Sequence, residues 1–326
     1  MSVKFSSAAF ALLCSFVVAN SALAQTADYP ARPVKVVLGY SAGGFTDLLA
    51  RLIAQRLSVS LGQPVVVENR PSAGATVSTE TVVRAPPDGY TLLIADIGQL
   101  AVTPALMDKL PFDTVKDLAP ITYTGDLPLF LVAHNSVPAN TFAELVTLIK
   151  AKPGQISFGT SGIGSIHHLN TEAMKSVFGL DVLIVHYKGA APAVPALLRG
   201  EILLSFLSMN AIRSHLASGP IKILAVNTPK RTGLSPNTPT VAEQGAPDFD
   251  YPAGIGMLAP VGTPSPIITK LATEIAAAMR YGDNPKRLAD LGFEVVGGTP
   301  EHFAALIKGA VAKYAKVVKA SGARAN

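Results

Sequence analysis

Short apolar runs alternate with helix-period segments along nearly the whole chain. The first unit shows the pattern, because an apolar run at 34–38 precedes Leu48, Leu49 and Leu52, which share one face of a helix. The pattern predicts strands at 34–38, 65–67, 91–95, 129–133, 155–158, 182–187, 202–207, 221–226, 254–259 and 293–296. Nearly continuous apolar strands with intervening helices predict parallel sheets covered on both faces.

Two such α/β units follow one another, and the chain then returns toward the first. The second unit begins near 129, and the Pro-, Thr- and Gly-rich segment 228–250 is typical of a return crossing. We therefore expect two doubly wound lobes, the first built from residues 25–125 with 250–326 and the second from 126–249. Ligands of open α/β sheets bind at the carboxyl ends of the strands, so the cleft between the lobes is the expected site.

The first 24 residues have the pattern of a cleaved export signal. Lys4 precedes an apolar stretch at 8–19, and Ala22-Leu23-Ala24 places small residues where signal peptidase needs them. A membrane anchor needs about 20 apolar residues, which this stretch does not reach. We expect cleavage after Ala24 and a periplasmic protein.

Composition narrows the function further. Only 15% of the 326 residues are charged, against about 25% in an average domain, which excludes a disordered or acidic-tail protein. The single cysteine, Cys14, lies in the predicted leader, so thiol catalysis and cysteine-bound metals are excluded from the mature chain. The net charge of +5 becomes +4 without Lys4, and no run of basic residues indicates nucleic-acid binding.

Three predicted strand-to-helix turns carry small residues that expose backbone amides. They lie at 39–47 and 159–165, where glycines recur, and at 187–190. Glycine permits close approach of a ligand, and the free amides of a helix start attract a carboxylate. Asp47 is interpreted as an early-turn carboxylate that offsets the helix dipole. Such turns in both lobes predict a site that closes on an anion from two sides.

Enzyme and metal motifs fit the sequence less well. Residues 159–163 lack the final glycine of a nucleophile elbow, and no phosphate-binding glycine loop occurs. Adjacent His167 and His168 point about 100° apart on a helix, so we expect no metal. A periplasmic serine hydrolase that uses Ser161 or Ser165 with His167 or His168 remains an alternative. A ligand-loaded partner of a membrane sensor is another, since it needs the same cleft.

Several stretches spread over 29–320 resemble the extracytoplasmic receptors of tripartite tricarboxylate transporters, also called Bug-type receptors. The matching stretches are 29–33 (YPARP), 43–47 (GGFTD), 61–71 (LGQPVVVENRP), 87–92 (PDGYTL), 187–192 (YKGAAP), 239–243 (PTVAE) and 258–264 (LAPVGTP). The resemblance implies a two-lobed periplasmic binding protein of type II topology. It also implies a receptor, not an enzyme, that holds no cofactor and hands a small carboxylate to a membrane permease.

The resemblance implies that backbone amides and hydroxyls of the first two glycine turns hold the ligand. The positions that it marks are Tyr40, Gly43, Gly44, Thr46, Thr160, Ser161, Gly164, Ser165 and His168. The residues themselves add five candidates near the predicted cleft, namely Ala42, Phe45, Asp96, Lys188 and Met209.

The sequence departs from the family's pattern at two places that bear on specificity. Phe45 stands where a third glycine is common, and we expect it to shape an apolar pocket for an aromatic or aliphatic carboxylate. Leu207-Ser208-Met209 replaces a common aspartate. An amino-acid ligand is then less favoured, because its ammonium group would lack an anionic partner.

Overall fold

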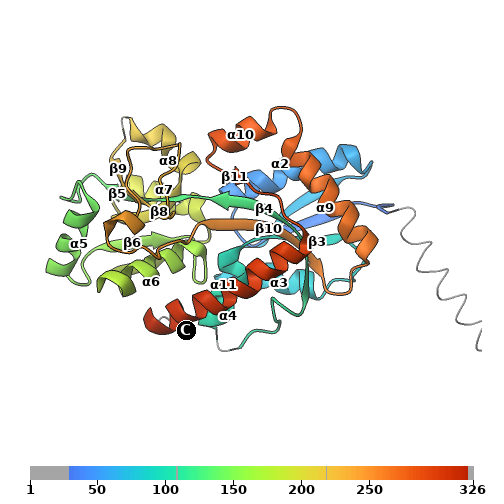
Figure 1. The fold of residues 1–326 in the computed structure, drawn as a ribbon, viewed down its shortest axis with the longest axis horizontal. Coiled ribbons are helices and arrows are strands. Elements are labelled where there is room, and N and C mark those ends of the chain that lie inside the picture. Colours follow the sequence, from blue (N-terminus) through green and yellow to red (C-terminus); the bar gives the residue numbers. More distant parts are fainter. Residues whose placement is uncertain (1–28, 108, 218, 322–326) are drawn as a thin grey trace, which may run out of the picture.

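Two β-sheets, one in each lobe, organise the residues described by the computed structural model, 29–107, 109–217 and 219–321 (Figure 1). The predicted leader at 1–24 lies outside the described residues. Each sheet is covered by helices, and two strands run side by side through the middle of the molecule from one lobe to the other.

The sheet of lobe 1 has six strands in the order β11-β4-β10-β3-β1-β2. These strands are β1 (Val34–Leu38), β2 (Val65–Asn69), β3 (Thr91–Asp96), β4 (Leu118–Leu127), β10 (Ala253–Pro260) and β11 (Glu294–Val295). β1 pairs in parallel with both β2 and β3, as the sequence predicted. The sheet is nevertheless mixed, because β10 enters from the other lobe and pairs antiparallel with β3 and β4.

The sheet of lobe 2 repeats this arrangement with five strands in the order β7-β6-β8-β5-β9. These strands are β5 (Leu129–His134), β6 (Ser157–Thr160), β7 (Leu183–His186), β8 (Leu204–Ser208) and β9 (Ile221–Val226). β5 arrives from lobe 1 and pairs antiparallel with β8 and β9, while β6 pairs in parallel with β7 and β8. In both sheets the incoming strand therefore lies between the third and fourth strands of the local unit.

Helices follow most strands, and the longer ones bury an apolar stripe. In lobe 1 the helical elements are α2 (Phe45–Ser60), η1 (Ala73–Ala75), α3 (Thr76–Val83), η2 (Gly98–Val102), α4 (Thr103–Leu106), α9 (Ser265–Arg280), α10 (Asn284–Asp290) and α11 (Pro300–Ser321). In lobe 2 they are α5 (Phe142–Ala151), α6 (Ile166–Phe178), α7 (Ala190–Leu198), α8 (Met209–Leu216) and η3 (Ala242–Gln244). On α2 the buried stripe is Leu49, Ile53 and Leu57, which lie four residues apart.

The two crossing strands connect the lobes. β4 ends at Leu127 and β5 begins at Leu129, so the chain leaves lobe 1 at Pro128. β10 brings the chain back and pairs with β4 along its whole length, with Ala253 opposite Leu127. The sequence pattern did not predict β4, because Pro120 and Gly125 interrupt its apolar run and the pairing shifts register twice.

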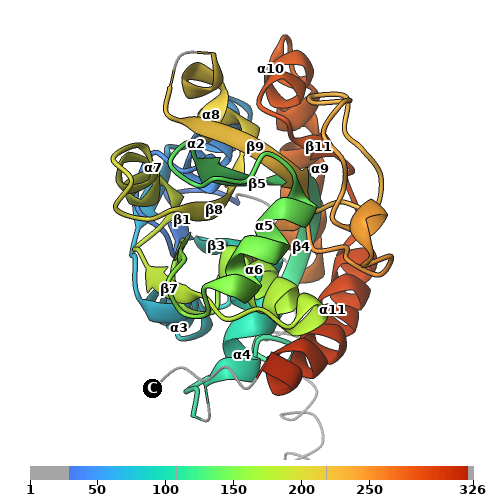
Figure 2. The same cartoon turned by 90° about the vertical axis from the view of Figure 1, so that its left-hand side faces the viewer.

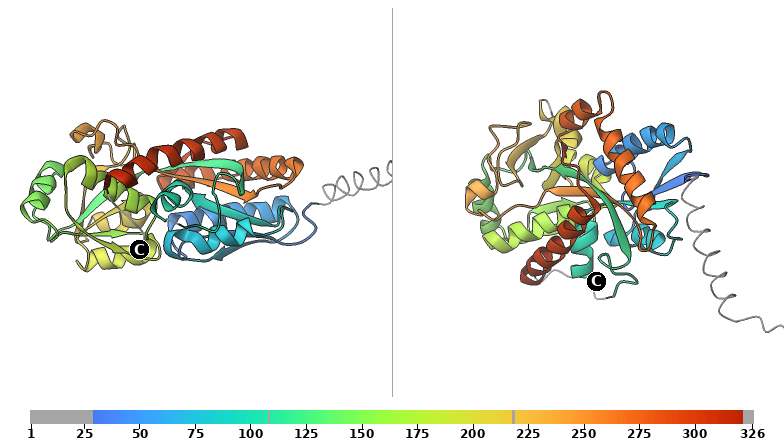
Figure 3. Two further views of the ribbon diagram at one scale, coloured as in Figure 1. Left: turned by 90° about the horizontal axis from the view of Figure 1, so that it is seen from below. Right: turned by 45° about the vertical axis from the view of Figure 1, so that its right-hand side comes forward.

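The last helix, α11, joins the lobes on one side. It packs on β4 and η2 of its own lobe and also along α6 of lobe 2 (Figures 2 and 3). Thr299 precedes the helix and Pro300 is its first residue, a position where the fixed φ of proline suits a helix. Helix α11 therefore connects the two lobes by packing as well as the crossing strands do by pairing.

Candidate functional site

The turn from β1 into α2 leaves the start of the helix without a side-chain cap. Gly43 has φ = 89°, which glycine adopts without strain, and Gly44 is the N-cap residue. No described side chain accepts a capping hydrogen bond from the first turn of α2. These amides carry the partial positive charge of the helix start and are available to an anion.

Asp47 holds this turn in place. Its Oδ2 accepts hydrogen bonds from the Gly43 amide at 3.0 Å and from Arg51 Nε at 3.0 Å. Its Oδ1 accepts from Arg51 Nη2 at 2.9 Å and from Asn69 Nδ2 at 3.0 Å. Burial works to raise the pKa of this carboxyl, yet the bonds from Arg51, Gly43 and Asn69 outweigh it and lower the pKa. Asp47 therefore acts as an ionic brace: Arg51 balances its negative charge, and its hydrogen bond to the Gly43 amide fixes the first turn.

A second buried carboxylate, Asp96, lies at the end of β3 beside Tyr40. Its Oδ1 accepts from the Gln99 amide at 2.8 Å. Burial raises the pKa of Asp96, and its interactions with Gln99, Tyr40 and Gly98 offset this in part. Burial and the neighbouring Asp96 carboxylate raise the pKa of Tyr40 well above its usual value. Tyr40 therefore stays a neutral phenol.

The second glycine turn leads from β6 into α6 and is capped by its own side chain. Ser165 Oγ accepts from the His168 amide at 3.2 Å and donates to the Gly162 carbonyl at 2.7 Å. Ser161 Oγ and His167 Nδ1 are 2.5 Å apart. Burial lowers the pKa of His167 to about 4, so its ring is neutral at physiological pH. This turn supplies a hydroxyl and a neutral imidazole to the cavity.

A polar cluster behind the second turn fixes its backbone. His168 Nδ1 accepts from the Gly164 amide at 3.3 Å, and His168 Nε2 lies 3.5 Å from Glu172 Oε1. The rings of His168 and His186 meet edge to face with centroids 4.8 Å apart, and Thr160 Oγ1 lies 2.7 Å from His186 Nδ1. These groups position the turn and do not line the cavity.

The third turn closes the mouth of the cleft. Both the amide and the hydroxyl of Ser41, in lobe 1, donate to the Lys188 carbonyl of lobe 2, at 3.0 and 2.6 Å. The Lys188 side chain is exposed. α7 begins directly afterwards at Ala190, and no described side chain caps its start. The lobes are therefore in contact across the mouth.

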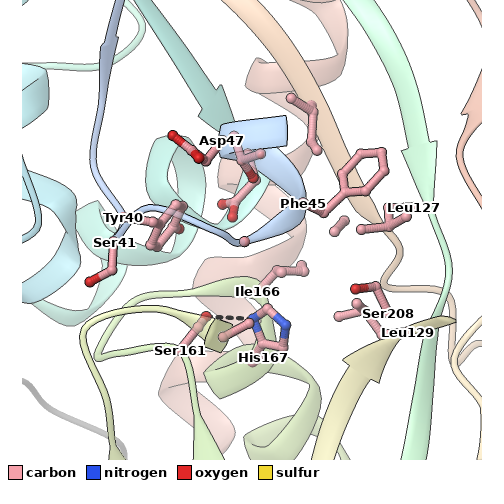
Figure 4. Close-up of a pocket in the computed structure, with 16 residues that line it drawn as sticks. Tyr40, Ser41, Phe45, Asp47, Leu127, Leu129, Ser161, Ile166, His167 and Ser208 are labelled. Carbon is pink, nitrogen blue, oxygen red and sulfur yellow. Dashed lines mark hydrogen bonds between the residues drawn. The ribbon is translucent and has the colours of Figure 1, made fainter. Parts of the chain in front are cut away.

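These elements line one cavity between the lobes (Figure 4). Eight of its lining residues carry polar side chains: Tyr40, Ser41, Thr46, Asp47, Asp96, Ser161, His167 and Ser208. The other eight are Gly44, Phe45, Leu127, Leu129, Ile166, Ala190, Ala253 and Ile255. The first residues of α2, α6 and α7 thus meet at one space, with both lobes contributing.

The structure brings six of the fourteen sequence candidates to this cavity, namely Tyr40, Gly44, Phe45, Thr46, Asp96 and Ser161. Eight others do not line it: Ala42, Gly43, Thr160, Gly164, Ser165, His168, Lys188 and Met209. Gly43, Gly164 and Ser165 shape the turns, whereas Thr160 and His168 belong to the cluster behind the second turn.

Sequence reasoning assigned His167 less weight than His168 and chose Met209 instead of its neighbour Ser208. Successive residues of a helix point about 100° apart, so the choice within each pair needed the exact start of the helix. Leu127, Leu129, Ala253 and Ile255 were missed as well. They could have been found from the two places where the chain crosses between the lobes, since the crossing strands run beneath the cleft.

Within the described ranges, no group of three or more His, Cys, Asp or Glu side chains is arranged to hold a metal ion. Across the same residues, no helix combines the length and apolar character that a bilayer span requires.

Comparison with known proteins places the chain among binding proteins. It is 35% identical over 297 residues to protein BugT of Bordetella pertussis, with 91% of each chain covered. A solved periplasmic transporter is 36% identical with a TM-score of 0.86, covering 91% of this chain and 99% of that one.

Two further solved structures were determined with acids. Rpa4515 of R. palustris, with adipate, is 33% identical with a TM-score of 0.85 over 90% of this chain and 98% of that one. MatC from Rhodopseudomonas palustris, with bound malate, is 30% identical with a TM-score of 0.84 over 89% and 100%.

The sequence model of the tripartite tricarboxylate transporter family receptor, TctC, matches residues 49–323. This match covers most of the chain, and the two mixed sheets agree with the solved periplasmic binding proteins. The chain therefore belongs to the TctC or Bug-type receptors, a family of periplasmic solute-binding proteins and not of enzymes.

Proposed function

We propose that this receptor captures a small organic carboxylate by closure of its lobes and delivers it to a tripartite tricarboxylate-type permease. One observation carries the proposal: the starts of α2, α6 and α7 converge on a single interlobe cavity. The starts of α2 and α7 have no side-chain cap, so their amides, which carry partial positive charge, can hold a carboxylate without an arginine or lysine. The adipate and malate of the two similar structures are acids of this kind.

The ligand's carboxylate would lie between the first turn of α2 and the pair Ser161–His167. The α2 amides would donate from lobe 1, and the Ser161 hydroxyl would donate from lobe 2. His167 accepts or donates through a neutral ring, so its hydrogen bond carries no net charge. Donors on both lobes favour the closed form, because a ligand that binds both lobes stabilises their contact.

We also propose the division of the chain that this motion needs. Residues 25–125 with 250–326 would move against 126–249, with β4 and β10 as the connection. Export would remove residues 1–24, with cleavage after Ala24, and place the receptor in the periplasm, where it contacts the inner-membrane permease peripherally.

The hydrolase alternative does not hold, because the family is not enzymatic. The Ser161–His167 pair also lacks the features of a catalytic serine and its base. Burial keeps His167 neutral, and no described carboxylate is hydrogen-bonded to its ring to raise its basicity. The pair presents a hydroxyl to the ligand.

Thermal unfolding with a panel of acids tests the proposal. Binding to the folded state raises stability by RT ln(1 + [L]/Kd), about 2.7 kcal/mol at a hundredfold excess over Kd. At least one mono-, di- or tricarboxylate should raise the melting temperature, and its neutral amide should not. If every acid leaves the melting temperature unchanged, the proposal fails. Uptake of the bound acid, lost in cells without the receptor, separates transport from the sensor alternative.

A further inference from the structure

We infer that the ligand is a monocarboxylate with an apolar body, unlike the dicarboxylates adipate and malate that were found with the two similar structures. This inference rests on the proposed function. It adds which kind of ligand body the apolar part of the cavity accepts. The cavity is divided: helix starts and hydroxyls line one part, and the crossing strands line the other (Figure 4).

The apolar part is a continuous wall at the base of the cleft. Leu127 and Ala253 are direct partners in the β4–β10 pair, Ile255 follows on β10 and Leu129 begins β5. Each of these four side chains lines the cavity and is at least 96% buried. Phe45 completes the wall, and in Figure 4 it lies with Leu127 and Leu129 on the side away from Tyr40 and Ser41.

This wall is rigid because the fold fixes its members. The Phe45 ring packs on Phe293 with centroids 5.1 Å apart, so it does not swing freely. Leu127 and Ala253 lie on strands paired along their full length, and Leu129 pairs with Ser208 of β8. A hydrocarbon chain or ring placed against them would gain burial without displacing a bound polar group.

Charge disfavours a second carboxylate in this part. None of the described residues that line the cavity is a lysine or an arginine, and its acids are Asp47 and Asp96. Arg51 lies outside and is bonded to Asp47 through two nitrogens. A carboxylate placed against the strand side chains of the wall would lose its water and contact only hydrocarbon, which strongly disfavours its binding.

Ser208, the strand partner of Leu129, also lines the cavity and places a hydroxyl beside the wall. It is the N-cap residue of α8, yet its hydroxyl makes no capping bond among the described residues. Met209, the first residue of α8, does not line the cavity, so that helix start offers the ligand only the N-cap residue. One hydroxyl fits an uncharged group such as an alcohol on the ligand.

Acids that share a carbon skeleton test the inference by calorimetry on the mature chain. The pairs are hexanoate with adipate and benzoate with terephthalate. We expect the monocarboxylate of at least one pair to bind roughly tenfold or more tightly than its dicarboxylate, since hydrophobic pockets discriminate on this scale. Equal or tighter binding of the dicarboxylate in both pairs overturns the inference and leaves the proposed function standing. If no acid binds, both fail.

Two leucines on one strand provide a matched control. Leu129 and Leu131 are both fully buried on the same face of β5, but only Leu129 lines the cavity. Leu129→Ala should weaken binding of the preferred monocarboxylate roughly tenfold, and Leu131→Ala should leave its affinity within about twofold. Leu127→Ala, at the end of β4, examines the same wall if Leu129→Ala does not fold. Equal changes in the cavity and control variants, or none, contradict the inference.

Discussion

The two glycine turns of the cleft are built in opposite ways. The turn before α2 ends in an uncapped helix start, and Asp47 braces it from within the helix. The turn before α6 is capped by Ser165 and braced from behind by His168. Both have glycines with positive φ and both face the same cavity.

The difference separates two tasks. Lobe 1 offers backbone amides whose positive potential selects an anion, and an ionic brace holds them without adding net charge. Lobe 2 offers the Ser161 hydroxyl and the neutral ring of His167, which are already hydrogen-bonded to each other before a ligand arrives. Of these two turns, the one in lobe 1 therefore recognises charge, whereas the one in lobe 2 supplies directional hydrogen bonds and part of the closing surface.

The largest effect should come from Gly164→Ala in the second turn. A Cβ there would lie 2.3 Å from Thr103 Oγ1 of the other lobe, and Gly164 has φ = 74°. Strain and overpacking together should lower the free energy of unfolding by about 3 kcal/mol in urea titrations and weaken acid binding.

Gly43→Ala is the matched control in the first turn. It has the same kind of backbone strain, at φ = 89°, but a Cβ would lie 3.8 Å from Ala191, an ordinary contact. Its cost should be about 1 kcal/mol. Thr103→Ala should partly rescue Gly164→Ala and have no such effect with Gly43→Ala. Equal costs for the two glycines would contradict the interlobe contact.

Asp47→Asn should have the next largest effect. The substitution removes the charge that binds Arg51 and leaves the Gly43 amide with a weaker acceptor, at a cost of about 2 kcal/mol in urea unfolding. Acid affinity should fall too, because the α2 amides lose their fixed orientation. Arg51→Gln should reproduce part of the stability loss. An unchanged affinity in Asp47→Asn would show that the brace is not needed for recognition.

Ser165→Ala tests the brace of the second turn. It removes the N-cap of α6 and the bond to the Gly162 carbonyl, and should cost about 1.5 kcal/mol in the same unfolding assay. Acid affinity should change less than in Asp47→Asn, since Ser165 does not line the cavity. Ser165→Thr, which keeps a hydroxyl, should restore most of the loss. A larger affinity loss than in Asp47→Asn would reverse the division of tasks between the lobes.

Much of the fold could be predicted from residue pattern. β1 and β9 occupy the predicted residues, 34–38 and 221–226. β4 could not be predicted, since Pro120 and Gly125 disrupt its period and its partner β10 lies more than a hundred residues away. The mixed sheets have the same origin, because strand direction is set by the crossings and not by local sequence.

The site was predictable as a region and less so as a set of side chains. Glycine turns in both lobes indicated a cavity between them, and Tyr40, Thr46 and Ser161 line it. Which of two adjacent residues faces the cavity depends on helix phase, so His167 and Ser208 were not chosen. The apolar wall depends on long-range pairing of Leu127 with Ala253, which no local pattern contains.

The smallest effect on stability at neutral pH should come from His167→Asn. This variant tests whether the imidazole that lobe 2 offers to the ligand is uncharged. Burial lowers the pKa of His167 to about 4 from an ordinary 6.5, so between these values the unfolded chain binds a proton that the folded chain does not. Stability from this residue is thus full above pH 6.5 and is lost as the pH falls toward 4. Wild type should lose about 1 kcal/mol more than His167→Asn between pH 7 and 5.5 in urea titrations. Ser161→Ala keeps the buried ring and should keep the wild-type pH dependence, so a loss of that dependence would assign the shift to the hydroxyl and not to burial.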